Sequence, residues 1–379
     1  MSIDKGIVIS PGRVNILGEH VDYNDGLVLP AAIDRTVHIS FSQRSDNFIG
    51  LHAKDYEQKC LISLLDLESR IDHNGDPIPD WAYFPAGVAH TLQQHGYQVH
   101  GFDAEYHSDI PIGAGLSSSA AVEVGFAVVC QELGGWEMDR LTLARICQDA
   151  EVHYVGVKCG LMDQFACANG VEGHAVLFDT RSLESKAVPL PRDTTLVIAD
   201  SMVRRSLRSS SYNDRRQDCE TAVVYFHELN PEIRSLRDVP HPLFLAHSAH
   251  LPPRVYQHAR HVVEEIERVN QAIGYLEAGQ AREFGELMFE THYSLRDFFE
   301  VSCPELDMLV ELAQGIEGCL GARLTGAGFG GCTVNLVESE KAGAFIKKLH
   351  AGYLQKTGLQ AQVFQTHASQ GAHLLQQTQ

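Results

Sequence analysis

A glycine- and serine-rich segment between an extended stretch and an apolar run constrains this chain more than any other feature. Residues 101–108 read as extended and residues 122–133 as helical, and between them stands Pro111-Ile112-Gly113-Ala114-Gly115-Leu116-Ser117-Ser118-Ser119-Ala120-Ala121. Glycines let the backbone approach an anion closely, hydroxyls donate hydrogen bonds, and the start of a helix presents unpaired N–H groups with a favourable dipole. The segment predicts a phosphate-binding turn. An ordinary strand-to-helix turn with a serine cap is the alternative.

A dense polar cluster lies near the amino terminus, in Gly12-Arg13-Val14-Asn15-Ile16-Leu17-Gly18-Glu19-His20-Val21-Asp22-Tyr23-Asn24. Core packing does not explain so many charged groups. A tight turn around a hydroxyl-rich small molecule does, because each sugar hydroxyl is both a donor and an acceptor and needs a fixed partner. The quartet Glu19-His20-Val21-Asp22 therefore favours a polyhydroxylated substrate. A solvated loop after a short first strand is the alternative.

A third segment, the glycine-rich residues 324–332, formally matches the dinucleotide fingerprint G-x-G-x-x-G between Gly326 and Gly331. The fingerprint must follow a strand and open a helix. Here the β-branched run at residues 333–337 follows instead, so we reject a dinucleotide fold. The chain also lacks G-x-x-x-x-G-K-[ST] and the protein-kinase triplets H-R-D and D-F-G. A nucleotide, if bound, is bound by another kind of site.

Taken together, these three segments resemble those of the GHMP small-molecule kinases, and within them the galactokinases. Residues 12–23 are similar to the galactokinase signature, residues 113–119 to the phosphate-binding motif of the superfamily, and residues 324–331 to its third motif. The resemblance extends over nearly the whole chain through further stretches, namely residues 160–165, 206–212, 260–264, 294–297 and 301–307. The first segment and residues 301–307 point to galactokinases in particular.

The resemblance implies two domains with the active site in the cleft between them. The hydrophobic periodicity predicts an α+β (mixed α/β) fold, in which helices alternate with strands at residues 36–42, 174–178, 194–200, 333–337 and 361–365. The strongest helical pattern covers residues 254–277, where apolar residues recur at three-to-four spacing on one face. The proline-rich residues 189–193 mark a boundary. We expect an N-terminal domain over residues 1–190, with the sugar signature and the phosphate motif, and a C-terminal domain over residues 191–379, with the third motif.

Phosphoryl transfer needs a nucleophilic hydroxyl, a metal ion on the phosphates, positive charge against the developing negative charge, and optionally a base. Asp163 stands alone among apolar neighbours and is a candidate base. Similarity to galactokinases assigns it to the C1 hydroxyl of the sugar. Arg13 would pair with this carboxylate and with the transferring phosphoryl group. A cap or turn residue is the alternative for Asp163.

The resemblance also implies the remaining contacts. Mg²⁺ keeps several waters and needs few protein oxygens, and the family pattern places Ser119 and Glu151 as its ligands; a solvated helix face is the alternative for Glu151. Position by position, the sugar contacts are Glu19, His20 and Asp22 with their neighbour Val21, together with Gly160 and Tyr212. ATP would lie on Gly113, Ala114, Gly115, Leu116, Ser117, Ser118 and Ser119. Trp81 borders the adenine pocket or is a plain core residue.

Composition limits the partners. A net charge of −19 argues against a nucleic-acid backbone or an anionic membrane, which both need excess Lys and Arg. The arginines between Arg204 and Arg216 are interleaved with Ser, Tyr, Asn and Asp, which favours a local counterweight near phosphates or a solvated surface over RNA binding. Nine cysteines show no paired spacing, no apolar run reaches membrane-spanning length, and no signal segment opens the chain, so we expect a cytoplasmic enzyme.

The expected function is ATP-dependent phosphorylation of α-D-galactose at C1, giving α-D-galactose 1-phosphate and ADP with Mg²⁺, the first committed step of galactose use. Alternatives are a kinase for a related sugar such as N-acetylgalactosamine, a kinase for a non-sugar alcohol such as mevalonate or homoserine, and a non-catalytic galactose and ATP sensor. Known sensors lack two residues of the serine motif, whereas residues 115–121 are full length here. The paired histidines at residues 247 and 250, and at 258 and 261, lack a joining cysteine, which disfavours a zinc site. The sequence identifies no protein partner.

Overall fold

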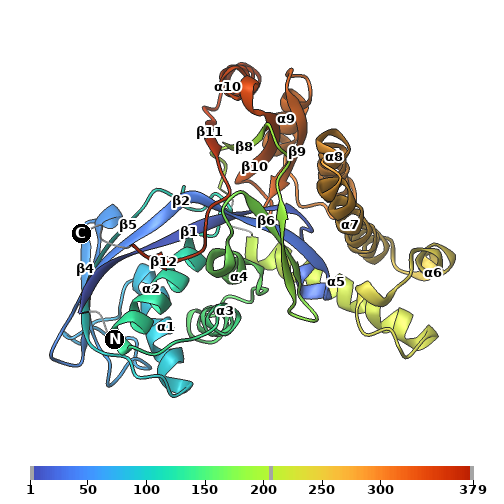
Figure 1. The fold of residues 1–379 in the computed structure, drawn as a ribbon. Coiled ribbons are helices and arrows are strands. Elements are labelled where there is room, and N and C mark those ends of the chain that lie inside the picture. The colour runs from blue at the N-terminus through green and yellow to red at the C-terminus, as the bar shows by residue number, and fades with distance from the viewer. Residues whose placement is uncertain (1–3, 205–207, 376–379) are drawn as a thin grey trace.

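The computed structural model describes residues 4–204 and 208–375, with the side chains of residues 208–212 left out of the description. The chain forms two β-sheets, each covered by helices (Figure 1). The first sheet has the strand order β12-β1-β2-β5-β3-β4, with β6 paired to β2 and β7 to β6. Its strands are β1 (Lys5–Leu17), β2 (Leu27–Gln43), β3 (Phe48–Ala53), β4 (Gln58–Ser63), β5 (Phe102–Ser108), β6 (His174–Asp179), β7 (Ser185–Pro189) and β12 (His373–Leu374).

Helices cover one face of this sheet. They are α1 (Tyr83–Gln94), α2 (Ser118–Gly134), α3 (Arg140–Asp149) and α4 (Met162–Asn169). α2 packs directly on β1 and β2 and is buried along most of its length, because its residues are apolar or small on nearly every face. α2 and α4 therefore bring their amino-terminal ends close to β1, where the candidate residues lie.

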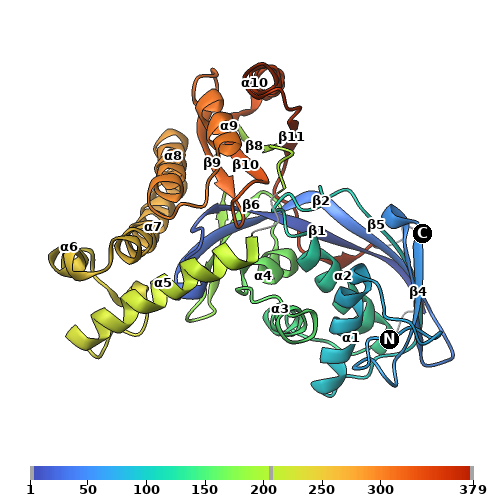
Figure 2. The same ribbon diagram turned by 180° about the vertical axis from the view of Figure 1, so that it is seen from behind.

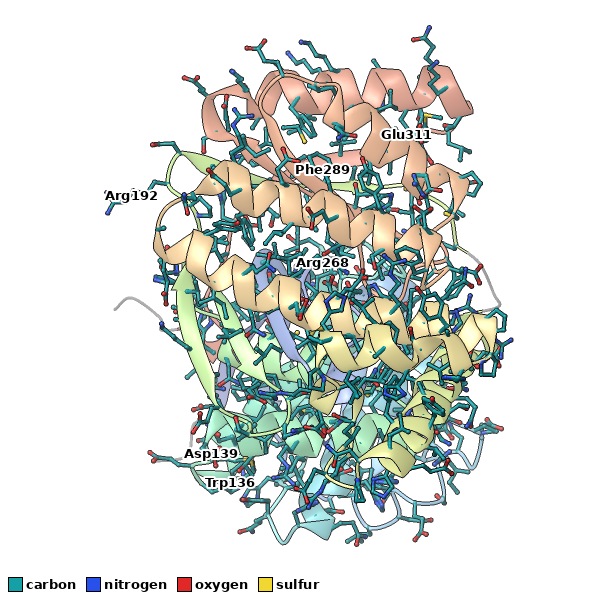
Figure 3. The ribbon with its side chains drawn as sticks, turned by 90° about the vertical axis from the view of Figure 1, so that its right-hand side faces the viewer. Trp136, Asp139, Arg192, Arg268, Phe289 and Glu311 are labelled. Carbon is teal, nitrogen blue, oxygen red and sulfur yellow. The ribbon has the colours of Figure 1, made fainter. Side chains whose placement is uncertain are left out.

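The second sheet is antiparallel, with the order β11-β8-β10-β9. Its strands are β8 (Thr194–Asp200), β9 (Cys319–Thr325), β10 (Cys332–Glu338) and β11 (Gln362–Thr366). The remaining helices are α5 (Arg208–Leu229), α6 (His241–His247), α7 (Pro253–Glu277), α8 (Ala281–Asp297), α9 (Pro304–Gln314) and α10 (Ala342–Thr357). α8 packs on β9, and α7 lies between α8 and the first sheet, as Figure 2 shows from behind. Figure 3 looks onto α7 and α8, which carry Arg268 and Phe289.

Most predicted elements are present. The five predicted strands coincide with parts of β2, β6, β8, β10 and β11, and the predicted helix over residues 254–277 is α7. The prediction of a tight turn over residues 12–24 is wrong for its first half, because residues 12–17 belong to β1 and are buried. This part of β1 is buried, and the guanidinium of Arg13 is paired with Asp163 inside the protein.

The chain crosses between the two sheets twice. After β7 ends at Pro189, the chain enters the second sheet at Thr194. After β11 the chain returns to the first sheet, where Leu374 and His373 of β12 pair with Val8 and Ile9 of β1. The amino- and carboxyl-terminal segments are therefore neighbours in the first sheet.

Candidate active site

A cavity of about 460 Å³ lies where the end of β1, the start of α4 and the third glycine-rich segment meet. Seven of the predicted residues line it, namely Arg13, Glu19, His20, Asp22, Glu151, Gly160 and Asp163. The remaining wall is made by residues 156–159, Met162, Asn213, Gly326 and Ala327. Residues that are up to about 300 positions apart in the sequence thus share one cavity.

Asp163 is held at both carboxylate oxygens. It lies in the first turn of α4, and its side chain is 31% exposed, toward the cavity. Nε and Nη2 of Arg13 contact Oδ1 at 2.9 and 2.7 Å, and the hydroxyl of Ser117 donates to Oδ2 at 2.6 Å. Because the guanidinium and the hydroxyl fix the plane of the carboxylate, the remaining lone pairs point in a defined direction. A carboxylate held in this way can accept a proton from a positioned hydroxyl.

Arg13 joins Asp163 to the phosphate-binding turn. Its Nη1 donates to the carbonyl of Gly115 at 2.7 Å. Its side chain is 4% exposed. Burial opposes the charged form of Arg13, but attraction to Asp163 and Glu19 outweighs it and raises the pKa of Arg13. Arg13 therefore places a permanent positive charge between the candidate base and the turn that would hold the phosphates.

The phosphate-binding turn needs its glycines. Gly113 and Gly115 have φ of +67° and +83°, in the left-handed region where side chains are disfavoured. Gly326 of the third glycine-rich segment packs closely on Gly115. A Cβ added to Gly326 would lie 2.9 Å from the carbonyl oxygen of Gly115. α2 then begins at Ser118, so its free N–H groups face the turn. Nearby, Nε of Arg204 donates to the carbonyl of Ile112 at 3.2 Å.

The loop after β1 presents Glu19 and His20. The Glu19 carboxylate pairs with Arg323, whose side chain is fully buried, and accepts the N–H of Gly326 at 2.9 Å. His20 has φ of +62° and its ring lies 4.8 Å from that of Phe299. Burial, reinforced by the nearby His261, lowers the pKa of His20 to about 3, so its imidazole is neutral.

Asp22 and Gly160 meet across the cavity wall. A Cβ on Gly160 would lie 1.7 Å from Oδ2 of Asp22, so glycine is required for their close approach. Burial, followed by the charges of Asp163 and Glu19, raises the pKa of Asp22 to about 7. A carboxyl group that titrates near neutrality can donate as well as accept hydrogen bonds, which suits recognition of a hydroxyl.

Glu151 and Ser119 are neighbours and fit a magnesium site. Glu151 lies in a single π-helical turn, Ala150–Val155, that continues α3, and it shares a hydrogen bond with Ser119. The amide Nε2 of Gln164 donates to Glu151 and, at 3.0 Å, to the buried Glu123. Burial and the charge of Asp163 raise the pKa of Glu151 to about 7. One carboxylate and one hydroxyl are the hard oxygen donors that Mg²⁺ accepts.

Other predicted residues do not line the cavity: residues 113–119 form the adjoining phosphate-binding turn, and Val21 and Trp81 lie elsewhere. Val21 is fully buried, and its carbonyl accepts the N–H groups of Asn24 and Gly26, both at 2.9 Å, so it supports the loop from behind. Trp81 donates from its indole to Gln58 at 2.7 Å and is absent from the cavity wall. Tyr212 belongs to α5, but its side chain lies outside the described residues.

Sequence reasoning missed several residues that organise the cavity. The bond from Ser117 to Asp163 was not predicted, and neither were the contacts of Arg323 and Gln164. No spacing rule links Arg323 to Glu19, which are separated by 304 positions. The one available signal was Gln164 itself, a polar residue directly beside the candidate base.

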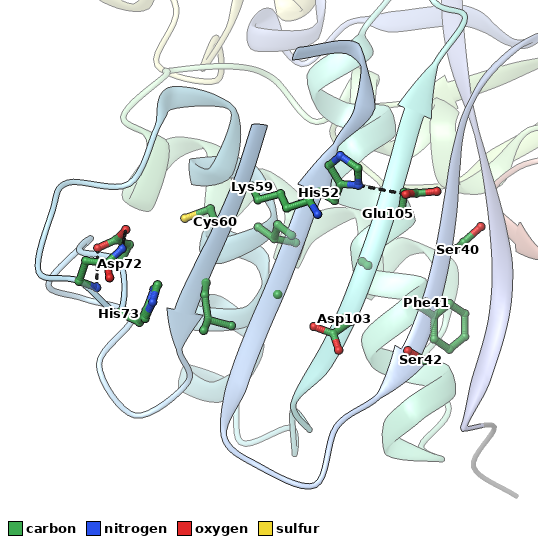
Figure 4. Close-up of a pocket in the computed structure, with 15 residues that line it drawn as sticks. Ser40, Phe41, Ser42, His52, Lys59, Cys60, Asp72, His73, Asp103 and Glu105 are labelled. Atoms are coloured by element: carbon green, nitrogen blue, oxygen red, sulfur yellow. Dashed lines mark hydrogen bonds and ion pairs between the residues drawn. The ribbon is translucent and has the colours of Figure 1, made fainter. Parts of the chain in front are cut away.

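A second cavity, of about 520 Å³, lies on the outer face of the first sheet and contains none of the predicted residues. Its lining comes from β2, β3, β4 and β5 and from the loop that carries Asp72 and His73 (Figure 4). His52 pairs there with Glu105 at 3.0 Å, and both side chains are substantially exposed. These charges are solvated and lie on the face opposite the helices, away from Asp163.

Two absences hold for the described residues. Within residues 4–204 and 208–375, no three side chains of His, Cys, Asp or Glu gather in the arrangement of a metal site. In the same part of the chain, none of the helices combines the length and apolar character that crossing a membrane requires. The nine cysteines all lie in this part of the chain, and none of them is in a disulfide.

Known protein families match most of the chain. The family model described as the galactokinase galactose-binding signature matches residues 2–43, the GHMP kinases N terminal domain matches residues 83–171, and the GHMP kinases C terminal domain matches residues 272–354. The first match contains the loop with Glu19, and the second contains the first turn of α4 with Asp163. The third match contains the third glycine-rich segment.

Individual relatives are similar over nearly their whole length. A galactokinase of Roseiflexus sp. (strain RS-1) is 44% identical, with 96% of this chain and 92% of the relative covered. A galactokinase of Bacillus subtilis (strain 168) is 39% identical, with 97% and 93% covered. The crystal structure of Lactococcus lactis galactokinase complexed with galactose superposes with a TM-score of 0.93 at 33% identity, covering 99% of this chain and 96% of that one.

Proposed function

Because this chain belongs to the galactokinase family of the GHMP kinases, it phosphorylates galactose with ATP, and we propose that Asp163 and Arg13 carry out the transfer at the C1 hydroxyl. The product would be α-D-galactose 1-phosphate. The observation that supports these roles is the bonding of Asp163, whose two oxygens are taken by Arg13 and Ser117 at the junction of the cavity and the phosphate-binding turn. ATP is the phosphoryl donor, as it is for the family.

The geometry of the cavity supports the proposed roles. Galactose would occupy the cavity between His20, Asp22 and Gly160, with its reacting hydroxyl toward Asp163. Asp163 would accept the hydroxyl proton, and Arg13 would stabilise the charge that develops on the transferring phosphoryl group. The phosphates would lie on residues 113–119, against the start of α2. Ser119 and Glu151 would hold Mg²⁺, which neutralises phosphate charge.

The cysteines and the net charge of the chain support two further proposals. We propose a cytoplasmic location, since none of the nine cysteines is in a disulfide and most of them are buried, as is usual where the environment is reducing. We also propose that small molecules rather than nucleic acids or membranes are its partners, in keeping with the net charge of −19. The two halves on either side of residue 190 would act as the two walls of the active site.

The test is ADP release from MgATP with a panel of acceptors. Galactose, N-acetylgalactosamine, glucose, galacturonate, mevalonate and homoserine would each be supplied at saturating concentration. Strong turnover with galactose alone supports the proposal. Faster turnover with N-acetylgalactosamine would reassign the substrate, and binding of galactose without turnover would identify a sensor.

A further inference from the structure

His261 is a buried histidine of α7 that the proposed reaction does not use. Its Nε2 donates to the main-chain carbonyl of Glu19 at 3.0 Å, and its Nδ1 accepts from the hydroxyl of Ser294 on α8 at 2.8 Å. The side chain is fully buried. Burial lowers the pKa of His261 to about 4, consistent with a neutral ring that has one donor and one acceptor. The ring is therefore fixed in orientation by both of its nitrogens.

The carbonyl that His261 binds belongs to a strained part of the loop. The peptide group between Glu19 and His20 leads into His20, whose φ of +62° is uncommon for a residue with a side chain. Such a conformation persists only where surrounding contacts hold it. His20 in turn lines the cavity and leads to Asp22.

The other anchors of this loop also come from the distal half of the chain. The N–H of Gly18 donates to Glu265 of α7 at 2.7 Å, and the Glu19 carboxylate is held by Arg323 of β9. His261 is the residue in the described structure that binds the main chain directly before His20. Residues 260–264 and 294–297, which resemble the galactokinases but had no function in the sequence analysis, meet at this point.

We propose that His261 is a positioning residue for galactose binding, holding the peptide between Glu19 and His20 so that His20 and Asp22 face the cavity. The inference rests on the proposed function, in which this loop binds galactose. His261 is absent from the cavity wall, so it acts through the loop and not on the substrate.

His258 provides a matched control. It lies one turn earlier on α7, is equally buried, and also packs near Phe299, with ring centroids 5.2 Å apart against 4.7 Å for His261. Its Nδ1, however, bonds to Asp218 of α5 at 2.8 Å and not to the loop. His261→Phe removes the bonds to Glu19 and Ser294, and His258→Phe removes the bond to Asp218, so both variants lose buried hydrogen bonds of the same helix but only His261→Phe releases Glu19.

The experiment measures galactose Kd by calorimetry without ATP, and KM for both substrates, in His261→Phe and His258→Phe. Both variants should have a lower Tm. Only His261→Phe should raise the Kd and KM for galactose, by at least about fivefold, the effect of one lost hydrogen bond, with KM for ATP unchanged. His261→Gln, whose amide can donate from a similar position, should recover galactose binding, and the shorter His261→Asn should not. The Gln and Asn pair serves if the Phe variant fails to fold.

The variant Asp22→Asn distinguishes a failure of the inference about His261 from a failure of the proposed function. If Asp22→Asn weakens galactose binding but His261→Phe behaves like His258→Phe, the inference about His261 is overturned and the proposed function stands. If Asp22→Asn leaves galactose binding unchanged, the loop is not the sugar site and both are overturned. An equal rise in KM for ATP and galactose in His261→Phe would also reject a positioning role.

Discussion

At the scale of single residues, the carboxyl groups that line the cavity differ in their bonding partners. Asp163 is fixed by a permanent cation and a hydroxyl, whereas Asp22 faces two other carboxylates and no cation is bonded to it in the described structure. Two carboxyl groups in one cavity therefore differ in environment, which is the pattern expected when two groups have different roles.

Asp163→Asn tests the role of the base. Asparagine keeps the size of the side chain but cannot accept the hydroxyl proton. We expect kcat to fall by at least about 10²-fold, the low end for a positioned base, while galactose Kd stays close to that of the unchanged protein. Steady-state kinetics with calorimetry would measure both. Turnover near the normal rate would remove Asp163 from the mechanism.

Asp22→Asn tests the titration of Asp22 through stability. The pKa of Asp22 rises from 3.8 to about 7 on folding, so at intermediate pH the folded state keeps a proton that the unfolded state has lost. Stability therefore falls as pH rises from about 4 to 7 and is constant above. The Tm of Asp22→Asn relative to the natural protein should increase across this window. A difference in Tm that is independent of pH would contradict the shifted pKa.

Glu151→Gln tests the metal ligand. Glutamine has the same size as glutamate and can still form hydrogen bonds, but it lacks the negative charge that attracts Mg²⁺. The Mg²⁺ concentration for half-maximal activity should rise, with KM for galactose unchanged. Binding of Mn²⁺ in the presence of ADP, followed by electron paramagnetic resonance, gives a readout independent of turnover. An unchanged titration would return Glu151 to a purely structural role.

At the scale of elements, the sequence predicts the helices, strands and turns whose formation depends on residues that are neighbours in the sequence. α7 and β8 are recognisable because their apolar residues recur at helical or strand spacing. The turn at residues 113–119 is recognisable because glycine and serine carry its chemistry locally. The local pattern predicts a turn at residues 12–17, because the partner that allows Arg13 to be buried in a strand is distant in sequence: Asp163 is 150 positions away.

The same difference between local and distant residues holds for the candidate site. Similarity to a known family identified seven residues of one cavity, but the contacts that orient them come from other segments. Arg323 has no local pattern that marks it, and although Gln164 and His261 lie in stretches that resemble the galactokinases, no local pattern gives their partners. Their roles depend on the packing of α4, α7 and β9 against the end of β1, which no spacing in the sequence encodes.

Gly160→Ala tests the close approach of the loop before α4 to the sugar loop. Because the added Cβ would lie 1.7 Å from Oδ2 of Asp22, that side chain must move. KM for galactose should rise by at least about tenfold if at least ~1.4 kcal/mol of binding is lost, and KM for ATP should not change. Gly274→Ala in α7 is the control, since no atom lies within 4 Å of its added Cβ. Equal kinetics in the two variants would contradict this account.

At the scale of the whole molecule, the carboxyl-terminal segment ties the second sheet to the first. Thr366 bonds to Asp34 at the end of β11, Ala368 pairs with Ile33, and β12 then extends the first sheet beside β1. Ala368 and Ala372 are part of the main hydrophobic core. These contacts keep β1, and with it Arg13, in a fixed relation to the second sheet.

Deletion of residues 367–379 tests this connection. The deletion uncovers the edge of β1 and removes buried alanines, so we expect a fall in Tm of several degrees, as for a loss of about 1–2 kcal/mol. Deletion of residues 376–379, which leaves β12 intact, is the matched control. Thermal melts of both shortened chains give the comparison. Equal Tm values would show that β12 adds nothing to stability.

The return of the chain to its first strand also sets an order of events during synthesis. β1 is translated long before its partner β12, which includes His373 and Leu374. Until then, the outer edge of β1 has unpaired N–H and C=O groups that can bind another strand. A growing chain of this protein therefore carries an open sheet edge at Val8 and Ile9 until β12 has been translated, and pairing with β12 is what covers it.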